Sequence, residues 1–236
     1  MSLSYRPGAR VWDVVQGPAF GSVGLATSGS LLALAAGTGL AFLTARGHRR
    51  TRALVQALSI LPLFLVAHGL VTGINEATFA LVQDGWIARP SWFALPDQPS
   101  VLRTSLAIVL LAVASGTLAE THAQIHDALV RIESSPFLDA ARARGAPLWP
   151  HIWRNLLPEL AATAAERVAF VVGGVVIAEK VLLLNGLGAV LWDAALLRDY
   201  DLALVIALLS AAFVGGVRLV AEIVRVTIDP RLRDAP

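Results

Sequence analysis

Five long apolar runs constrain this 236-residue chain more than any other feature of its sequence. They extend over residues 19–45, 53–82, 101–119, 161–184 and 202–226. A helix needs about 20 mostly apolar residues to cross a bilayer, and the runs meet or approach that length. The first, fourth and fifth have little polar face, which favours contact with lipid. We therefore predict an all-α polytopic membrane helix bundle with about five transmembrane helices in a single domain, residues 1–236.

The composition agrees with a membrane protein and excludes several other classes. Hydrophobic residues make up 56% of the chain and charged residues 15%, whereas soluble domains have roughly 45–50% and about 25%. The chain has no cysteine, which excludes disulfides, thiolate metal sites and thiol nucleophiles. Its only lysine is Lys180, and Glu179 stands before it where a phosphate-binding loop requires glycine. We therefore expect any ATP hydrolysis to take place on a partner subunit.

The arginines indicate how the chain is oriented. Four of them crowd the link between the first two runs, namely Arg46, Arg49, Arg50 and Arg52. Basic residues favour the cytoplasmic side of a membrane, so this link is predicted to be internal. Alternation then makes residues 83–100 external, residues 120–160 internal, the N-terminus external and the C-terminus cytoplasmic. Because the net charge is only +2 and the basic residues flank apolar runs, we expect no nucleic-acid partner.

The internal loop, residues 120–160, is predicted to contain a short helix. Ser134-Ser135-Pro136 indicates its start, because serine side chains cap helices and proline fits the first turn. Residues 137–144 continue the helix, and Gly145 can end it in a left-handed conformation. The loop is therefore expected to be ordered rather than flexible.

Several motifs of this loop and of the chain after it resemble one family. Asp139-Ala140-Ala141, Gly145 and Leu157-Pro158 resemble the "EAA…G…LP" cytoplasmic loop of binding-protein-dependent ABC importer permeases. Four later segments follow in order and are similar to the dipeptide/oligopeptide/nickel branch of these permeases: 173–179, Asn185-Gly186-Leu187-Gly188, Arg198-Asp199-Tyr200 and 229–233. Asp139 departs from the usual glutamate, which preserves charge but shortens reach. Members of the branch usually carry an additional N-terminal span, so we expect a naturally short five-span form or a truncated one.

The resemblance implies a function for the internal loop. In such permeases the loop forms a coupling helix that docks on a cytoplasmic ATPase. The residues that the resemblance assigns to coupling are Phe137, Leu138, Asp139, Ala140, Ala141, Arg142, Arg144, Gly145, Leu157 and Pro158. Phe137 and Leu138 are expected to present an apolar knob, and Arg142 and Arg144 to pair with acidic groups on the ATPase. The resemblance also implies a gate or subunit contact formed by Glu179, Gly186, Gly188, Arg198 and Asp199, with an interface anchor as the alternative for Glu179.

The resemblance also implies partners, cofactors and substrate. We expect a second, homologous or identical permease subunit, two ABC ATPase subunits, an extracytoplasmic solute-binding protein and the lipid bilayer of a bacterial inner membrane. ATP and magnesium would bind to the partner subunits and no cofactor to this chain, which would itself work by alternating access. Peptides are the expected substrate class, with nickel or another small solute as the alternative.

Two other functions are compatible with the sequence. An ion-gradient-driven secondary transporter would use Glu166 or Glu179, since ionisable residues inside a membrane are functional candidates. An intramembrane serine hydrolase would use Ser115, although the spacing supplies neither a base nor an oxyanion site. Glu166 and Arg167 are more simply interpreted as residues near the cytoplasmic interface that pair with a neighbouring span.

Two further polar features interrupt the apolar pattern. Asn75-Glu76 lies within the second apolar run. His122 and His126 are four residues apart and would share one face of a helix. Two histidines without a third fixed ligand make a weak metal site, so we expect a solvated helix end there and no metal.

Overall fold

The computed structural model describes residues 8–45, 49–58, 60, 62–86 and 101–228, and all regular elements among them are helical. In chain order they are α1 (Val11–Ala45), α2 (Arg49–Leu58), α3 (Leu63–Gln83), α4 (Val101–Val113), η1 (Ala114–Gly116), α5 (Thr117–Glu133), α6 (Pro136–Ala143), α7 (Leu148–Val181), α8 (Leu187–Leu196) and α9 (Tyr200–Ile228). In this part of the chain α1, α3, α7 and α9 are long and apolar enough to cross a membrane, and the bent pair α4–α5 is a fifth candidate. The predicted all-α membrane bundle is confirmed.

The first span is longer than predicted at its N-terminal end. Helix α1 begins at Val11, eight residues before the apolar run that starts at Ala19, and includes Pro18. A proline inside a helix removes one hydrogen bond to the carbonyl four residues earlier. The helix continues through Pro18 because Val14 and Val15 on the preceding turn are buried against other elements.

The second predicted span, residues 53–82, is divided into two helices. Helix α2 ends at Leu58 and α3 begins at Leu63, directly after Pro62. Pro62 is extended, with ψ of 135°. Proline has no N–H to donate and is favoured at a helix start, so it begins α3 instead of continuing α2. The long apolar run in the sequence therefore concealed the boundary between two helices.

The third predicted span, residues 101–119, is bent and extends further than expected. Helices α4 and α5 meet at 47° through the short 3-10 turn η1. Gly116 has a φ of +82° at the start of α5, a left-handed conformation that suits glycine. Helix α5 then continues to Glu133, so the first third of the predicted internal loop is helical.

The fourth and fifth spans are long helices, and a short helix separates them. Helix α7 begins at Leu148 rather than at Ala161, and α9 lies within two residues of its predicted bounds at each end. Helix α8 was not predicted, because ten residues are too few for a span.

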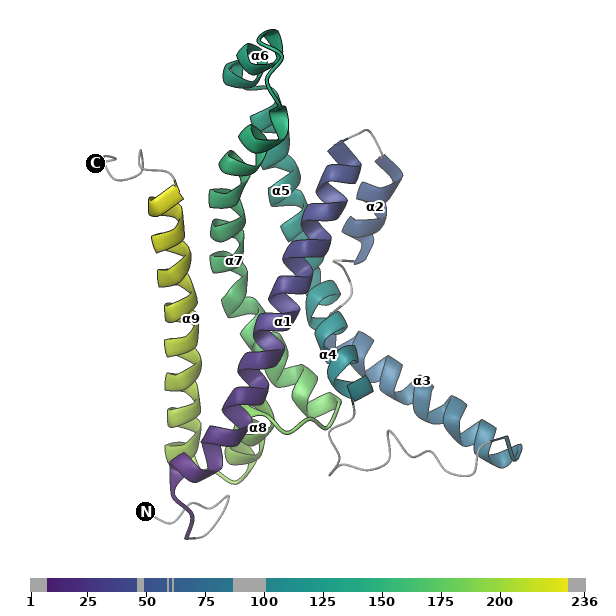
Figure 1. Cartoon of the computed structure of the whole chain (residues 1–236). Helices are drawn as coiled ribbons and strands as arrows, with labels where there is room; N and C mark the ends of the chain where they lie inside the picture. Colours follow the sequence, from purple (N-terminus) through teal and green to yellow (C-terminus); the bar gives the residue numbers. More distant parts are fainter. Residues whose placement is uncertain (1–7, 46–48, 59, 61, 87–100, 229–236) are drawn as a thin grey trace.

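The core is built around α1, which lies against α4, α5, α7 and α8. One buried cluster joins α1, α3, α4 and α7, a second joins α1, α8 and α9, and a third joins α1, α5 and α7. Helix α6 and the C-terminal ends of α1 and α9 lie at one end of the bundle, and α8 lies at the opposite end (Figure 1). Two sites at these opposite ends hold most of the residues singled out in the sequence.

Candidate functional site

The start of α6 has the predicted position but a different hydrogen-bond pattern. Ser135 is extended, with φ of −80° and ψ of 141°, and Pro136 is the first helical residue. Neither serine caps α6. The Ser135 hydroxyl donates to the carbonyl of Ile132, and the Ser134 hydroxyl donates to that of Arg131 at 3.1 Å. Both serines thus satisfy free carbonyls at the end of α5, which otherwise lack partners within that helix.

The end of α6 is fixed by Gly145, as predicted. This residue has a φ of +67°. Its N–H donates to the carbonyl of Arg142 at 3.0 Å, and the N–H of Ala146 donates to that of Ala141 at 3.0 Å. These two bonds form a Schellman motif, which satisfies the last carbonyls of the helix and turns the chain sharply. Helix α6 is therefore a short element with defined ends.

The two faces of α6 have different environments. Leu138 and Ala141 are three residues apart, share one face and are buried as α6 packs against α7. The expectation that Leu138 projects outward is therefore wrong: it anchors α6 to its own chain. The other predicted coupling residues on this helix and its end are exposed, namely Phe137, Asp139, Ala140, Arg142, Arg144 and Gly145. Phe137 keeps 42% of its surface exposed.

Arg142 already has a partner within α6. Its guanidinium lies 2.8 Å from the carboxylate of Asp139, one turn earlier. Such an exposed pair contributes only about 0.2–0.5 kcal/mol, so both groups can exchange partners at little cost. Of the two predicted motif residues in α7, Leu157 is 42% exposed and Pro158 is half-buried inside the helix.

Three polar contacts join α5 to α7. Arg131 pairs with Glu159 at 3.0 Å, and Gln124 donates to Glu166 at 2.8 Å. Glu120 forms an ion pair with Arg167. The α5 partners are spaced at four and seven residues and therefore share one helix face. The predicted pairing of Glu166 and Arg167 with a neighbouring span is confirmed, and that span is α5.

Aromatic side chains hold the base of α7 against α1. The ring of Phe42 lies 5.3 Å from that of Trp149 and 5.9 Å from that of Trp153, measured between centroids. The two tryptophans meet edge to face at 5.5 Å. Aromatic pairs in this distance range contribute about 0.5–1.5 kcal/mol beyond their buried area. Helix α6 thus projects from a packed base that α1, α5 and α7 form together.

At the other end of the bundle, Glu179 caps α8 from outside that helix. Its carboxylate accepts hydrogen bonds from the backbone N–H groups of Gly188 at 2.7 Å and Ala189 at 3.3 Å. These groups are among the first N–H donors of α8, which have no partner within the helix. The Ser22 hydroxyl of α1 donates to the same carboxylate at 2.6 Å and accepts from the N–H of Leu187 at 2.7 Å. One fully buried carboxylate therefore joins α1, α7 and α8.

The glycines beside Glu179 leave room for this arrangement. A Cβ atom on Gly186 would overlap the Glu179 carboxylate. A Cβ atom on Gly188 would overlap the backbone of Val176 in α7. The structure thus brings together Glu179, Gly186 and Gly188, three of the five residues predicted as a gate or subunit contact, and gives each a packing reason.

Arg198 and Asp199 lie at the opposite end of α8, where the chain enters α9. Arg198 is left-handed, with φ of +56°, and its N–H donates to the carbonyl of Ala195 at 3.2 Å. The N–H of Asp199 donates to that of Ala194 at 2.8 Å, which completes a second Schellman motif. The Asp199 carboxylate accepts from the N–H of Leu202 and so caps α9. This pair forms the turn between two helices.

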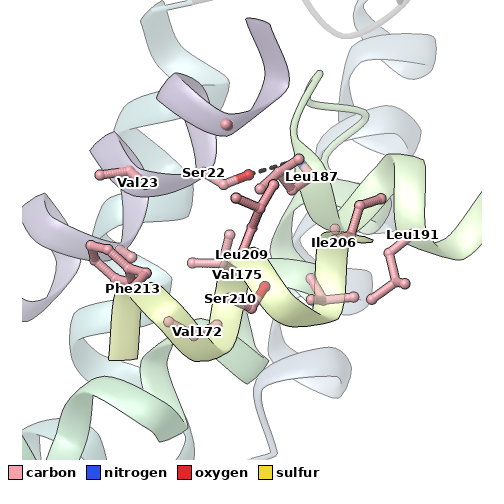
Figure 2. Close-up of a pocket in the computed structure, with 14 residues that line it drawn as sticks. Ser22, Val23, Val172, Val175, Leu187, Leu191, Ile206, Leu209, Ser210 and Phe213 are labelled. Atoms are coloured by element: carbon pink, nitrogen blue, oxygen red, sulfur yellow. Dashed lines mark hydrogen bonds between the residues drawn. The ribbon is translucent and has the colours of Figure 1, made fainter. Parts of the chain in front are cut away.

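A cavity of about 130 Å³ lies beside the Glu179 cap, between α1, α7, α8 and α9. Figure 2 shows apolar side chains from these helices around it, with Ser22 directed at Leu187. Among the described residues that line it, only Ser22 and Ser210 have polar side chains. Its lining therefore offers few hydrogen-bonding partners for an ordered water molecule.

Comparison with known proteins identifies the family. Residues 29–234 match the family described as the binding-protein-dependent transport system inner membrane component. The chain belongs to this family. Its helix bundle is accordingly that of an ABC type I importer permease, and the chain is a multi-pass inner-membrane component of a transport system.

Individual members of this family are identical to this chain at about a quarter of the aligned positions. The chain is similar to the oligopeptide transport system permease protein OppB of Salmonella typhimurium, with 26% identity over 179 residues, 74% of this chain and 54% of OppB. The Escherichia coli K12 protein of the same name gives the same values. Similarity to AppB of Bacillus subtilis is 28% over 108 residues, 44% of this chain and 34% of AppB. The chain spans about half the length of the OppB proteins it matches.

In this family member the histidine pair is not a solvated helix end, so that expectation is wrong. His122 and His126 are buried, and their rings stack at 5.8 Å. The hydroxyl of Thr44 in α1 lies 2.9 Å from His122 Nε2 and 3.3 Å from His126 Nδ1. Helix α1 approaches closely because Gly37 has no Cβ, which would lie 2.8 Å from Thr121. The described residues contain no group of three potential metal ligands.

Ser22, Thr44 and Arg103 make contacts in the structure that were not predicted from the sequence. Ser22 and Thr44 carry no recognisable signal, because their partners are 157 and 78 residues away. Arg103 does carry one, as an ionisable residue inside an apolar run. It is 2% exposed and donates to the carbonyl of Leu183, the left-handed residue after α7, at 3.5 Å.

Some predictions concern parts of the chain outside the described residues. These are the motif at residues 229–233, most of the external segment 83–100 and the link at residues 46–48. The side chain of Ser115 lies outside them as well.

Proposed function

We propose that this chain is the membrane-spanning subunit of an ATP-driven importer, and that α6 transmits movement from a cytoplasmic ATPase to the spans. The observation that carries the proposal is the two-sided environment of α6. Its inner face is anchored by Leu138, and its outer face presents Phe137, Ala140 and Arg144 at the tip of the bundle. A helix fixed on one side and free on the other suits docking into a partner's groove.

The connections of α6 to α5 and α7 provide a route by which a displacement of α6 would be transmitted to the membrane spans. Helix α5 precedes α6 in the chain and α7 follows it. The two helices are joined to each other by the Arg131–Glu159 and Arg167–Glu120 ion pairs. Rigid-body movement of packed helices is a common form of switching. Displacement of α6 would therefore move α5 and α7 together, and with them the Glu179 cap at the far end of α7.

The proposal includes an orientation and a set of partners. The end that bears α6 is cytoplasmic, which agrees with the gathering there of Arg131, Arg142, Arg144, Arg154 and Arg225. The N-terminus is then external. A second permease subunit completes the translocation path, two ATPase subunits hold ATP and magnesium, and a solute-binding protein delivers substrate to the α8 end.

Peptides are the proposed substrate class. The support for this class is the name of the OppB and AppB proteins, which are oligopeptide transport permeases. The secondary-transport alternative gains no support, because the Glu179 carboxylate caps α8 and Glu166 accepts from Gln124.

The test is ATP-dependent uptake of a labelled peptide library by proteoliposomes that contain the chain with its co-purifying subunits. Gly145→Pro forces φ to about −65° where the turn needs +67°, and Asp139→Lys places a second cation beside Arg142. Both variants should reach the membrane and lose at least tenfold in uptake. Gly215→Ala in α9, where a Cβ meets nothing within 4 Å, is the matched control. Unimpaired uptake in both variants, or uptake driven by an ion gradient without ATP, would overturn the proposal.

A further inference from the structure

Helix α3 carries a continuous polar stripe. His68, Thr72, Asn75, Glu76 and Gln83, here named the α3 polar stripe, are exposed and lie within a sector of about 100° at 100° per residue. Thr78, the remaining hydroxyl side chain of α3, lies outside this sector and bonds to the carbonyl of Ile74. Almost all hydrogen-bonding side chains of a candidate span thus share one face.

The α3 polar stripe faces away from the rest of the described chain. Leu63 and Ala67, two buried residues of α3, lie on the side of the helix away from the stripe, and Thr78, also buried, lies about 60° beyond the edge of the stripe. Leu63 and Ala67 join the core cluster, and α3 extends away from the other helices beyond them (Figure 1). Among the described residues, no hydrogen bond or ion pair joins Asn75 or Glu76 to another residue.

Lipid is an unsuitable neighbour for this stripe. Ionisable residues in membrane helices face the bundle interior, a partner or a water-filled cavity, because hydrocarbon leaves them unsolvated. The stripe from His68 to Gln83 is about 22 Å long at 1.5 Å per residue. That length covers much of a hydrocarbon core of about 30 Å. It is therefore a track along the span and not a single interfacial anchor.

We propose that the α3 polar stripe lines the aqueous translocation path and that Glu76 binds the cationic amino group of the transported solute. This inference rests on the proposed import function. Glu76 carries the one carboxylate of the stripe, and a carboxylate forms its strongest hydrogen bonds with a charged donor such as an ammonium group. Packing the stripe against another helix would bury that carboxylate, which is costly without a cation opposite it. Thr72 and Asn75 supply hydrogen bonds for the polar groups of the same solute.

The absence of cysteine from the chain makes the test direct. Thr72→Cys and Asn75→Cys place a thiol on the stripe, and Leu70→Cys and Ala77→Cys place one on the other exposed side of α3. The full chain, in membranes with its co-purifying subunits, is treated with a cationic trimethylammonium methanethiosulfonate and an anionic sulfonate methanethiosulfonate. Because the thiolate is the reacting species, a thiol in lipid reacts slowly. The stripe thiols should react at least tenfold faster than the controls.

The charge of the reagent tests the role of Glu76. The ratio of cationic to anionic rates at Thr72→Cys should fall at least threefold when Glu76→Gln is added. An unchanged ratio would overturn the cation site. Stripe thiols that react no faster than the controls, or that form disulfides between two copies of the chain without reacting with the reagents, would overturn the path assignment.

Labelling with added ATP and orthovanadate distinguishes a failure of the path assignment from a failure of the import proposal. A change in the labelling rate of the stripe is expected for ATP-driven alternating access. Stripe thiols that react rapidly but do not respond to ATP would contradict the import mechanism and leave the aqueous path in place.

Discussion

The Oε2 atom of Glu179 accepts a hydrogen bond from the backbone N–H of Gly188 at 2.7 Å, although the two residues belong to different helices. This bond places a carboxylate at the N-terminus of α8, where the helix dipole favours negative charge. Ser22 adds α1 to the same contact. One acidic group thus joins α1, α7 and α8 at the α8 end of the bundle.

Removal of that group should release α8. Glu179→Ala leaves the N–H groups of Gly188 and Ala189 without an acceptor, and each buried unsatisfied donor costs about 1–3 kcal/mol. Amide hydrogen exchange of Ala189 should accelerate by roughly tenfold or more, since 1.4 kcal/mol corresponds to a factor of ten. Glu179→Gln keeps one acceptor and should give a smaller effect. Exchange as slow in Glu179→Ala as in the wild type would show that the cap is dispensable.

Alanine substitutions at Gly186 and Gly188, the two glycines beside Glu179, should destabilise the protein for different reasons. Gly188→Ala meets the backbone of Val176, which cannot rotate away, and overpacking of this kind costs about 1–3 kcal/mol. For Gly186→Ala the three atoms nearest to the added Cβ all belong to the Glu179 side chain, so its cost should largely disappear in a Glu179→Ala background. Gly173→Ala in α7 meets nothing within 4 Å and serves as the control. Thermal unfolding in detergent measures all of these variants, and equal losses for Gly188→Ala and Gly173→Ala would refute the packing explanation.

Substitutions on the two faces of α6 should have different effects, one on the stability of the protein and the other on coupling to the ATPase. Leu138→Ala removes a fully buried side chain and should destabilise the chain by about 2–5 kcal/mol. Phe137→Ala removes an exposed one and should leave the melting temperature within about 1 °C while lowering ATP-dependent uptake severalfold. The measurement is a melting curve and an uptake assay on each variant. Loss of uptake without loss of stability in Leu138→Ala would reverse the assignment of the faces.

The sequence predicted those parts of the structure that depend on local signals. Pro136 and Gly145 fixed the bounds of α6 because one fits a first turn and the other a left-handed end. Pro62 carried the same kind of signal, but the apolar run around it concealed the break between α2 and α3. Helix α8 was missed because it is too short to show a period.

The parts that could not be predicted depend on distant neighbours. Leu138 is buried because α7 packs against it, and no property of residues 137–144 reveals which face that is. His122 and His126 are buried because Gly37 lets α1 approach α5. The resemblance singled out Glu179, but its role as a cap requires the position of α8, which only the fold supplies.

Cross-linking of α6 to an ATPase subunit tests the central claim most directly. Ala140→Cys on the exposed face and Leu138→Cys on the buried face are introduced into the cysteine-free chain, with the co-purifying subunits present. A short bismaleimide should join Ala140→Cys to the ATPase and leave Leu138→Cys unlinked, and ATP with orthovanadate should change the yield at position 140. A chain whose Ala140→Cys variant links to no ATPase subunit, in the presence or absence of nucleotide, would contradict the proposed coupling.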